Sequence, residues 1–262
     1  LEEYALATSG SYDFALTRDN IIDLAHQHIG VVGEGASASA NQVTEAARLL
    51  NMIVKFRSEE GMPLWALKRG FLLPNTSISS MATDSHVVTV YDGTYLASAA
   101  ASGASTITVN AIGNIANSDQ IGIELDSGDM QWTTVNGAPA GAVVTLTATL
   151  TGAAAANNRV YAYTASADRV QKPLKILSAD IILSSDSTSH EIWIEDRDDY
   201  FALPNRTSEG IPNLIYYDFA STSGTNLDNG SIFFWPRFES GKYVIEFTYH
   251  RPWQDFDAAG YN

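Results

Sequence analysis

Four carboxylates form the densest acidic cluster of this 262-residue chain. They are Glu195, Asp196, Asp198 and Asp199. Two carboxylates at a suitable separation catalyse glycoside hydrolysis, and several converging oxygens bind calcium. The spacing of this cluster does not match a calcium-binding loop. We therefore interpret it as a solvated strand end or loop; the alternatives are a subunit interface, the lumen of an oligomer, or the site of a cell-wall hydrolase.

Other catalytic and metal-binding patterns are missing from the sequence. There is no G-x-S-x-G, no G-x-G-x-x-G and no HExxH, and the chain has no cysteine. His26 and His28 are two residues apart on a predicted helix, so they point to different faces and cannot hold one metal ion together. We interpret all five histidines as ordinary core or surface residues. The sequence predicts a protein without catalytic residues, metal or cofactor.

The five tryptophans can stack on sugars or pack in a core. Trp65, Trp193 and Trp235 stand among other apolar residues, which predicts core positions. The segment after the last predicted strand is different, because its aromatic residues have no element to pack in. We predict that it is a partner-docking arm. Its aromatic residues are Trp253, Phe256 and Tyr261.

Composition narrows the class of protein further. With 45% hydrophobic residues, the chain can bury a core, and no apolar run is long enough to span a membrane. The net charge of −15 repels phosphate backbones and argues against a protein that grips DNA with lysine and arginine. It is compatible with a protein past which DNA slides. The absence of cysteine fits assembly in a reducing cytoplasm.

The first region of the chain has helical periodicity. Apolar residues at helical spacing predict a helix over 17–30, with Thr17 as its N-cap and Gly30 after its end. Ser39 and Gln42 form a capping box for a second helix over 39–60. Because the loop between them is short, we predict an antiparallel helix pair.

The middle region, residues 82–166, is rich in Ala, Thr, Gly and Val and poor in charge. Short alternating runs separated by turn residues predict an inserted all-β domain, a small β-sandwich or barrel. The predicted strands are Ser105–Val109, Gln120–Leu125, Met130–Val135, Val143–Leu146 and Arg159–Tyr163. The parent domain then comprises residues 1–81 and 167–262.

Heavier strands return in the last region. Leu174–Leu183 and His190–Glu195 are predicted to pair, and residues 231–251 are predicted to form a β-hairpin. Alternate residues of its second strand, from Tyr243 to Tyr249, share one face. Pro236 has no amide to donate, which predicts an edge or bulged first strand. The predicted fold class is α+β: a helix pair, an antiparallel β-domain and the inserted domain.

Three stretches of the chain carry a resemblance to a known family. They are "TRDNIIDLAHQHIGVVGEG" with "NQVTEAARLLNMIVKFRSEEGMPLWALKRGFLLP", "ADIILSSDSTSHEIWIEDRDDYFALPNRTSEGIPNLIYYDF", and "IFFWPRFESGKYVIEFTYHRPWQDFDAAG". In order and spacing the chain resembles the head-to-tail adaptor, or tail accessory, proteins of short-tailed phages, the family that includes the packaged-DNA stabilisation protein of P22-like phages. The resemblance covers about two thirds of the chain and includes no catalytic signature.

The resemblance implies a structural virion protein in the neck of the phage. It implies a homo-dodecameric ring that binds the portal protein, presents a platform for the tail nozzle or tube, and helps to retain and pass the packaged DNA. It also implies further helical sequence after Asn262. The inserted domain departs from the smallest family members, and it is an outward decoration or a clasp on a neighbour. The alternative function is a carbohydrate- or cell-surface-binding module of a phage tail, suggested by the Thr/Ala-rich middle region.

Overall fold

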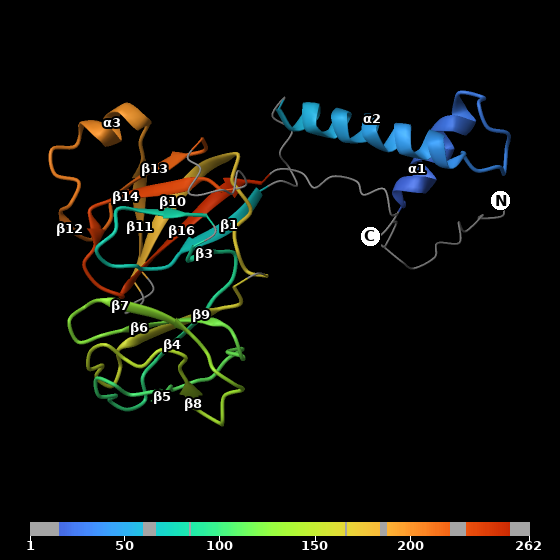
Figure 1. Ribbon diagram of the computed structural model, residues 1–262. Helices are drawn as coiled ribbons and strands as arrows, with labels where there is room; N and C mark the ends of the chain where they lie inside the picture. The colour runs from blue at the N-terminus through green and yellow to red at the C-terminus, as the bar shows by residue number, and fades with distance from the viewer. Residues whose placement is uncertain are drawn as a thin grey trace, which may run out of the picture. The chain divides into compact units, whose positions relative to one another are not determined.

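The computed structural model is a mixed α+β protein, mostly sheet with few helices (Figure 1). Its contacts divide the chain into two units. One unit comprises Leu1–Met62 with Trp253–Asn262, and the other comprises Pro63–Pro252. The residues that the structure describes are 16–59, 67–83, 85–165, 167–183, 188–220 and 229–251.

The first unit contains two helices, whose ends confirm the predicted capping. Helix α1 spans Arg18–His28, and the Thr17 hydroxyl accepts a hydrogen bond from the Asn20 amide at 3.2 Å. Helix α2 spans Ala40–Glu59. At its start the Gln42 side chain accepts from the Ser39 amide at 2.8 Å, as a capping box requires.

The loop between the helices is held by polar contacts with α1. The Ala38 amide donates to Asp23 Oδ1 at 2.8 Å, and Gln27 Nε2 donates to the Ala36 carbonyl at 3.2 Å. Among the described hydrophobic residues of this unit, only Ile22 and Ala47 are buried. The side-by-side antiparallel packing of the two helices stays a prediction.

The second unit is built on an eight-stranded sheet that nearly closes into a barrel (Figure 1). The strand order is β2-β14-β13-β11-β10-β16-β1-β3. The two edge strands, β2 and β3, are joined by only four residues, so the ends of the sheet come close together. The bounds are β1 Leu67–Leu72, β2 Ser80–Ala82, β3 Val87–Val88, β10 Lys175–Leu183, β11 Ser189–Ile194, β13 Leu214–Asp218, β14 Ser231–Trp235 and β16 Tyr243–His250.

Strand β16 lies inside this sheet, paired antiparallel with β1 on one side and with β10 on the other. As predicted, Tyr243, Ile245, Phe247 and Tyr249 share a face, and all four are in the hydrophobic core. Gly70 of β1 lies opposite Phe247, where a Cβ atom would come within 2.6 Å of the Phe247 ring. Glycine is required there because the aromatic ring occupies the space of a side chain.

The predicted β-hairpin over residues 231–251 is wrong. Both strands exist, but β14 pairs with β13 and β2, whereas β16 pairs with β1 and β10. Pro236 has no amide for a ladder, so the first strand is interrupted. The residues after it form the short strand β15 (Arg237–Phe238), which pairs with β12 (Glu209–Gly210). The edge position predicted for the first strand is also wrong, since β14 has neighbours on both sides.

The parent sheet is not entirely antiparallel. Strand β10 pairs antiparallel with β11, as predicted, but β11 and β13 are parallel. A parallel pair needs a crossover connection, and here the crossover contains a short helix, α3 (Arg197–Ala202). Neither the parallel pair nor this helix was predicted from the sequence.

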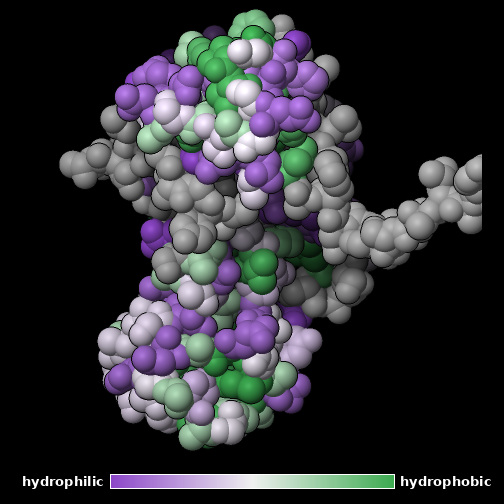
Figure 2. Space-filling model, turned by 90° about the vertical axis from the view of Figure 1, so that its right-hand side faces the viewer, coloured by the Kyte–Doolittle hydropathy of each residue, from purple (hydrophilic) through white to green (hydrophobic). Residues whose placement is uncertain are grey.

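The middle region forms a four-stranded sheet in the order β4-β9-β6-β7 and a two-stranded sheet of β5 and β8. Its buried residues form a second core cluster, separate from that of the parent sheet. In the lower part of Figure 2 its surface is mainly pale and purple, with small green areas. The bounds are β4 Asp92–Tyr95, β5 Thr106–Thr108, β6 Gln120–Glu124, β7 Met130–Thr134, β8 Val143–Thr145 and β9 Arg159–Tyr163. The 82–166 domain boundaries stay a prediction.

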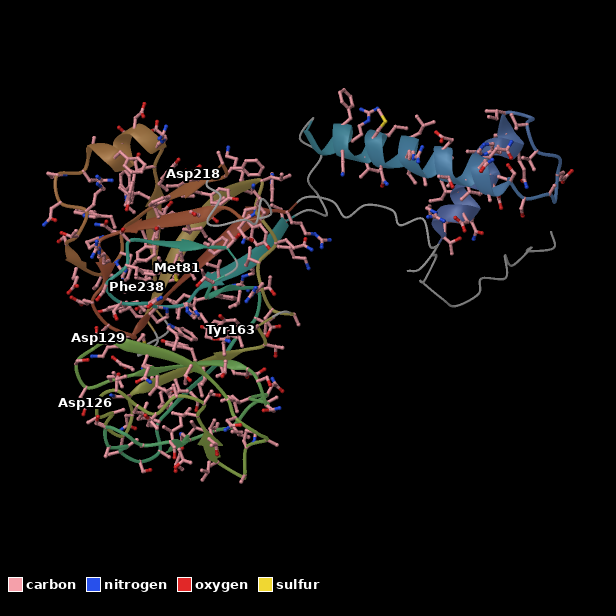
Figure 3. All side chains as sticks on the ribbon, viewed as in Figure 1. Met81, Asp126, Asp129, Tyr163, Asp218 and Phe238 are labelled. Carbon is pink, nitrogen blue, oxygen red and sulfur yellow. The ribbon has the colours of Figure 1, made fainter. Side chains whose placement is uncertain are left out.

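A third cluster joins the two cores. It combines Leu73, Val88 and Val244 of the parent sheet with Met130, Tyr161 and Tyr163 of the middle region. The Tyr161 hydroxyl donates to the Gly241 carbonyl at 2.6 Å, and the Trp132 indole donates to the Pro74 carbonyl at 3.1 Å. Figure 3 labels Tyr163 where the two sheets meet. These contacts make the parent sheet and the middle region one packed unit.

Replacing Phe247 with alanine tests the core of the parent sheet. The side chain is almost fully buried, so Phe247→Ala leaves a cavity and lowers the free energy of unfolding by about 3–5 kcal/mol. Urea unfolding followed by near-ultraviolet circular dichroism measures this loss. The exposed Glu191→Ala on β11 is the matched control and changes stability by less than about 0.5 kcal/mol. A loss below about 1 kcal/mol for Phe247→Ala contradicts the assigned core.

Candidate functional site

The acidic cluster lies at the start of α3. The Asp196 carboxylate caps this helix by accepting a hydrogen bond from the Asp199 amide at 3.1 Å. Asp198 and Asp199 occupy the first turn and are exposed, and Glu195 is half-buried. The strand end predicted from the sequence is therefore followed directly by a helix start, where carboxylates complement the exposed amides. Whether the cluster faces an interface or a lumen stays a prediction.

Helix α3 is anchored on the outer face of β13 and β14 by aromatic packing. The buried Tyr200 ring lies 5.8 Å from that of Tyr216 and 5.4 Å from that of Phe233. Phe201 is partly exposed, and the Arg206 guanidinium lies 4.9 Å from its ring centroid. This packing holds the carboxylates of α3 in a defined position on the surface.

The core position predicted for Trp193 is wrong, because 71% of the surface of this residue is exposed. Only Ile192 of strand β11 is buried, and side chains alternate between the two faces of a strand. Trp193 therefore points outward, on the same face as α3 and next to Leu214 of β13. Trp235 is half-buried and donates to the Asn205 carbonyl at 2.7 Å, and Trp65 lies outside the described residues.

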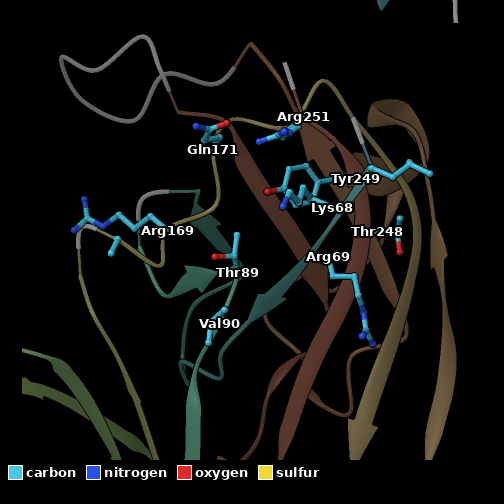
Figure 4. Close-up of a pocket in the computed structure, with 11 residues that line it drawn as sticks. Lys68, Arg69, Thr89, Val90, Arg169, Gln171, Thr248, Tyr249 and Arg251 are labelled. Atoms are coloured by element: carbon cyan, nitrogen blue, oxygen red, sulfur yellow. The ribbon is translucent and has the colours of Figure 1, made fainter. Parts of the chain in front are cut away.

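A pocket of about 600 Å³ opens at one end of β1 and β16 (Figure 4). Four of the 15 lysines and arginines of the chain line it: Lys68, Arg69, Arg169 and Arg251. Arg69 forms an ion pair with Glu246. Within the described residues, no carboxylate lies within ion-pairing distance of Lys68, Arg169 or Arg251. This basic pocket therefore attracts anions on a chain that is acidic overall.

The basic pocket was not predicted, because its cations come from three distant segments of the sequence. Each segment carries only one or two of them, and no charge run marks the site. Pairing of β1 with β16, and of Val88 with Arg169, brings the segments together. A cluster of charges can be predicted from the sequence when its residues are close together along the chain. The cations of this pocket are brought together by pairing of distant segments instead.

His86 occupies the junction between the parent sheet and the middle region. Its ring stacks on Trp132 with centroids 4.0 Å apart, and Nδ1 lies 3.0 Å from the Tyr163 hydroxyl. Burial, with a smaller contribution from the Arg169 guanidinium, lowers the pKa of His86 from 6.5 to about 4. A neutral, stacked imidazole at the junction is a structural role, in agreement with the sequence interpretation.

No arrangement of acid, base and nucleophile stands out in the described part of the chain. Within the same residues, no group of three or more His, Cys, Asp or Glu side chains is placed to hold a metal ion. None of the described helices is long and apolar enough to cross a membrane. The predicted docking residues Trp253, Phe256 and Tyr261 lie outside the described residues.

Comparisons with known proteins give no relatives. No family model matches the sequence, no curated protein matches it, and no solved structure matches the fold. The class of protein defined so far is a mixed α+β fold with a nearly closed sheet and a basic pocket.

The buried His86 predicts a specific loss of stability in acid. Its folded pKa lies below its ordinary value, so between about pH 6.5 and pH 4 the unfolded chain binds a proton that the folded chain does not. The free energy of unfolding therefore falls as the pH is lowered through this range, by about 2–3 kcal/mol from His86 alone. His86→Asn, which suits the positive φ of this residue, removes that contribution.

The measurement is the free energy of unfolding at pH 7 and at pH 4 for both proteins. The carboxylates contribute equally in the variant and in the unmodified chain. The difference between the two proteins in the stability lost from pH 7 to pH 4 is therefore the contribution of His86. An equal loss of stability in the variant and the unmodified chain contradicts this account of the junction.

Proposed function

We propose that this chain is a structural adaptor subunit of a short-tailed phage virion, which forms a homo-dodecameric ring between the portal and the tail nozzle or tube. The proposal is supported by the resemblance of three stretches to the adaptor family. One of these stretches supplies both helices of the first unit, and the other two supply β11, β13 and β16 of the parent sheet with most of β14 and part of β10. In this role the packaged DNA passes through the ring, and the acidic surface keeps it from sticking.

The observation that carries the proposal is an apolar ridge along α2. Leu49, Met52, Ile53 and Phe56 follow one side of the helix and are each 56–67% exposed. This ridge lies in the first of the three stretches that resemble the adaptor family. The helical unit buries few of its own described side chains, so it gains stability mainly by contact with another surface. A portal and neighbouring subunits provide such surfaces in an adaptor ring.

The finer features of the fold acquire roles within this proposal. The two helices pack as an antiparallel pair when they are held in the ring. The middle region forms an inserted β-sandwich that decorates the outside or clasps a neighbour. Trp253, Phe256 and Tyr261 dock on a partner.

The alternative, a carbohydrate- or cell-surface-binding module, has less support. Trp132 is the only tryptophan of the middle region. Its ring stacks on His86 and its indole nitrogen is hydrogen-bonded to Pro74, so neither is available to a sugar. No other observation favours this function over the adaptor.

Native mass spectrometry of the chain mixed with the portal protein of its own phage tests the proposal. The expected result is a dodecameric complex of the chain on the portal. Met52→Glu with Phe56→Glu places charge on the ridge and abolishes the complex, because charged side chains cannot be buried there without partners. Thr44→Glu, on a different side of the same helix, is the matched control and leaves the complex intact.

Absence of a portal complex with the unmodified chain overturns the adaptor proposal. In that case retention of the whole chain on host cells, measured by sedimentation of cells with labelled protein, favours the surface-binding module. Circular dichroism of each variant verifies that α2 is still formed.

A further inference from the structure

We infer that the basic pocket binds the Trp193–α3 edge of a second copy of this chain, in a head-to-tail contact that repeats around the proposed ring. The Trp193–α3 edge comprises Trp193, Asp196, Asp198 and Asp199. The inference rests on the proposed function for its ring geometry, and its contact residues are independent of the portal.

The basic pocket offers both charge and apolar surface. Lys68, Arg169 and Arg251 line the pocket, and none of them has a carboxylate partner among the described residues. Leu67 and Val90 are exposed at the same pocket and supply its apolar surface. A cavity of about 600 Å³ accommodates an indole side chain together with neighbouring carboxylates.

The Trp193–α3 edge offers the complementary groups. Trp193 is a large aromatic side chain with most of its surface in solvent, and exposed tryptophans are frequent anchors of interfaces. Asp198 and Asp199 extend from a helix that is fixed by Tyr200, so their charges are pre-positioned. An indole face beside guanidinium groups adds cation–π attraction to the ion pairs.

The two surfaces use different strands of the nearly closed sheet, with Trp193 on β11, the fourth strand of the order. Helix α3 packs on β13 and β14, the third and second strands of the order, whereas β16, β1 and β3 at the pocket are the sixth to eighth. A surface that binds a different surface of an identical molecule forms a heterologous contact, which generates a ring where the rotation closes.

Charge favours a second copy over nucleic acid as the occupant. The chain carries twice as many acidic as basic residues, 30 against 15, so its overall field repels a phosphodiester backbone. A neighbour carries the same net charge, but its Trp193–α3 edge adds the exposed indole of Trp193, an apolar group that a phosphodiester backbone lacks. Patches of opposite charge also favour one register, because a chain with a net charge of −15 brings acidic surfaces together at most other orientations.

Charge reversal in the whole chain tests the inference. The pocket variant is Arg169→Glu with Arg251→Glu, and the edge variant is Asp198→Lys with Asp199→Lys. Sedimentation equilibrium at 50 mM and 500 mM salt, about 14 Å and 4 Å of screening length, measures the self-association constant. The unmodified chain associates more tightly at low salt, and each variant alone associates at least about tenfold more weakly.

An equimolar mixture of the two variants recovers association, because the acidic pocket of one accepts the basic edge of the other. A chain that carries all four substitutions recovers it as well. Trp193→Ala weakens association at both salt concentrations, since it removes apolar contact. Asn110→Lys, an exposed position in the middle region, is the control and changes nothing.

The inference is overturned by an unmodified chain that stays monomeric at both salt concentrations, or by a mixture that does not recover association. It is also overturned if the unmodified chain binds a fluorescent duplex DNA and the pocket variant does not, because the pocket is then a phosphate site. These outcomes are distinct from failure of the adaptor proposal. Self-association that depends on the pocket, in a chain that ignores the portal, overturns only the adaptor function.

Discussion

The packing of strand β16 is the interaction on which the rest of the second unit depends. It has hydrogen-bonded neighbours on both sides, and one of its faces supplies Ile245, Phe247 and Tyr249 to the core of the parent sheet. On its other face Val244 enters the cluster that joins the middle region. The turn before it accepts the Tyr161 hydroxyl through Gly241. One strand therefore stabilises the barrel-like sheet, attaches the middle region and places Tyr249 and Arg251 at the basic pocket.

Near-closure of the sheet has a consequence for the surface. A closed sheet leaves few strand edges for a partner to extend, so contacts with other molecules must use side chains. The exposed side chains include a tryptophan on β11, carboxylates on α3, cations at the pocket and an apolar ridge on α2. A chain that hides its backbone and exposes such groups is suited to assembly with defined neighbours.

The electrostatic organisation is equally uneven. An overall charge of −15 keeps identical copies apart at most orientations, yet four cations are gathered at one pocket. At the junction, His86 stacks on Trp132, and burial lowers its pKa so that the imidazole stays neutral. The same chain thus gathers charge at defined places on its surface and holds a neutral imidazole between its two cores.

Local patterns in the sequence were sufficient for the elements. Periodicity and capping residues predicted α1 and α2 to within two residues, and alternation predicted most strands of the middle region, because these signals act over a few residues. Pairing was decided only by tertiary structure. The residues of the predicted hairpin separate into β14, β15 and β16 with different neighbours, since a strand bonds to whichever partner completes the core. Tertiary structure also decided the face of β11 that is buried: Ile192 points inward, so Trp193 is exposed although its apolar neighbours predicted a core position. Lys68, Arg169 and Arg251 line one pocket only because distant segments of the chain are in contact.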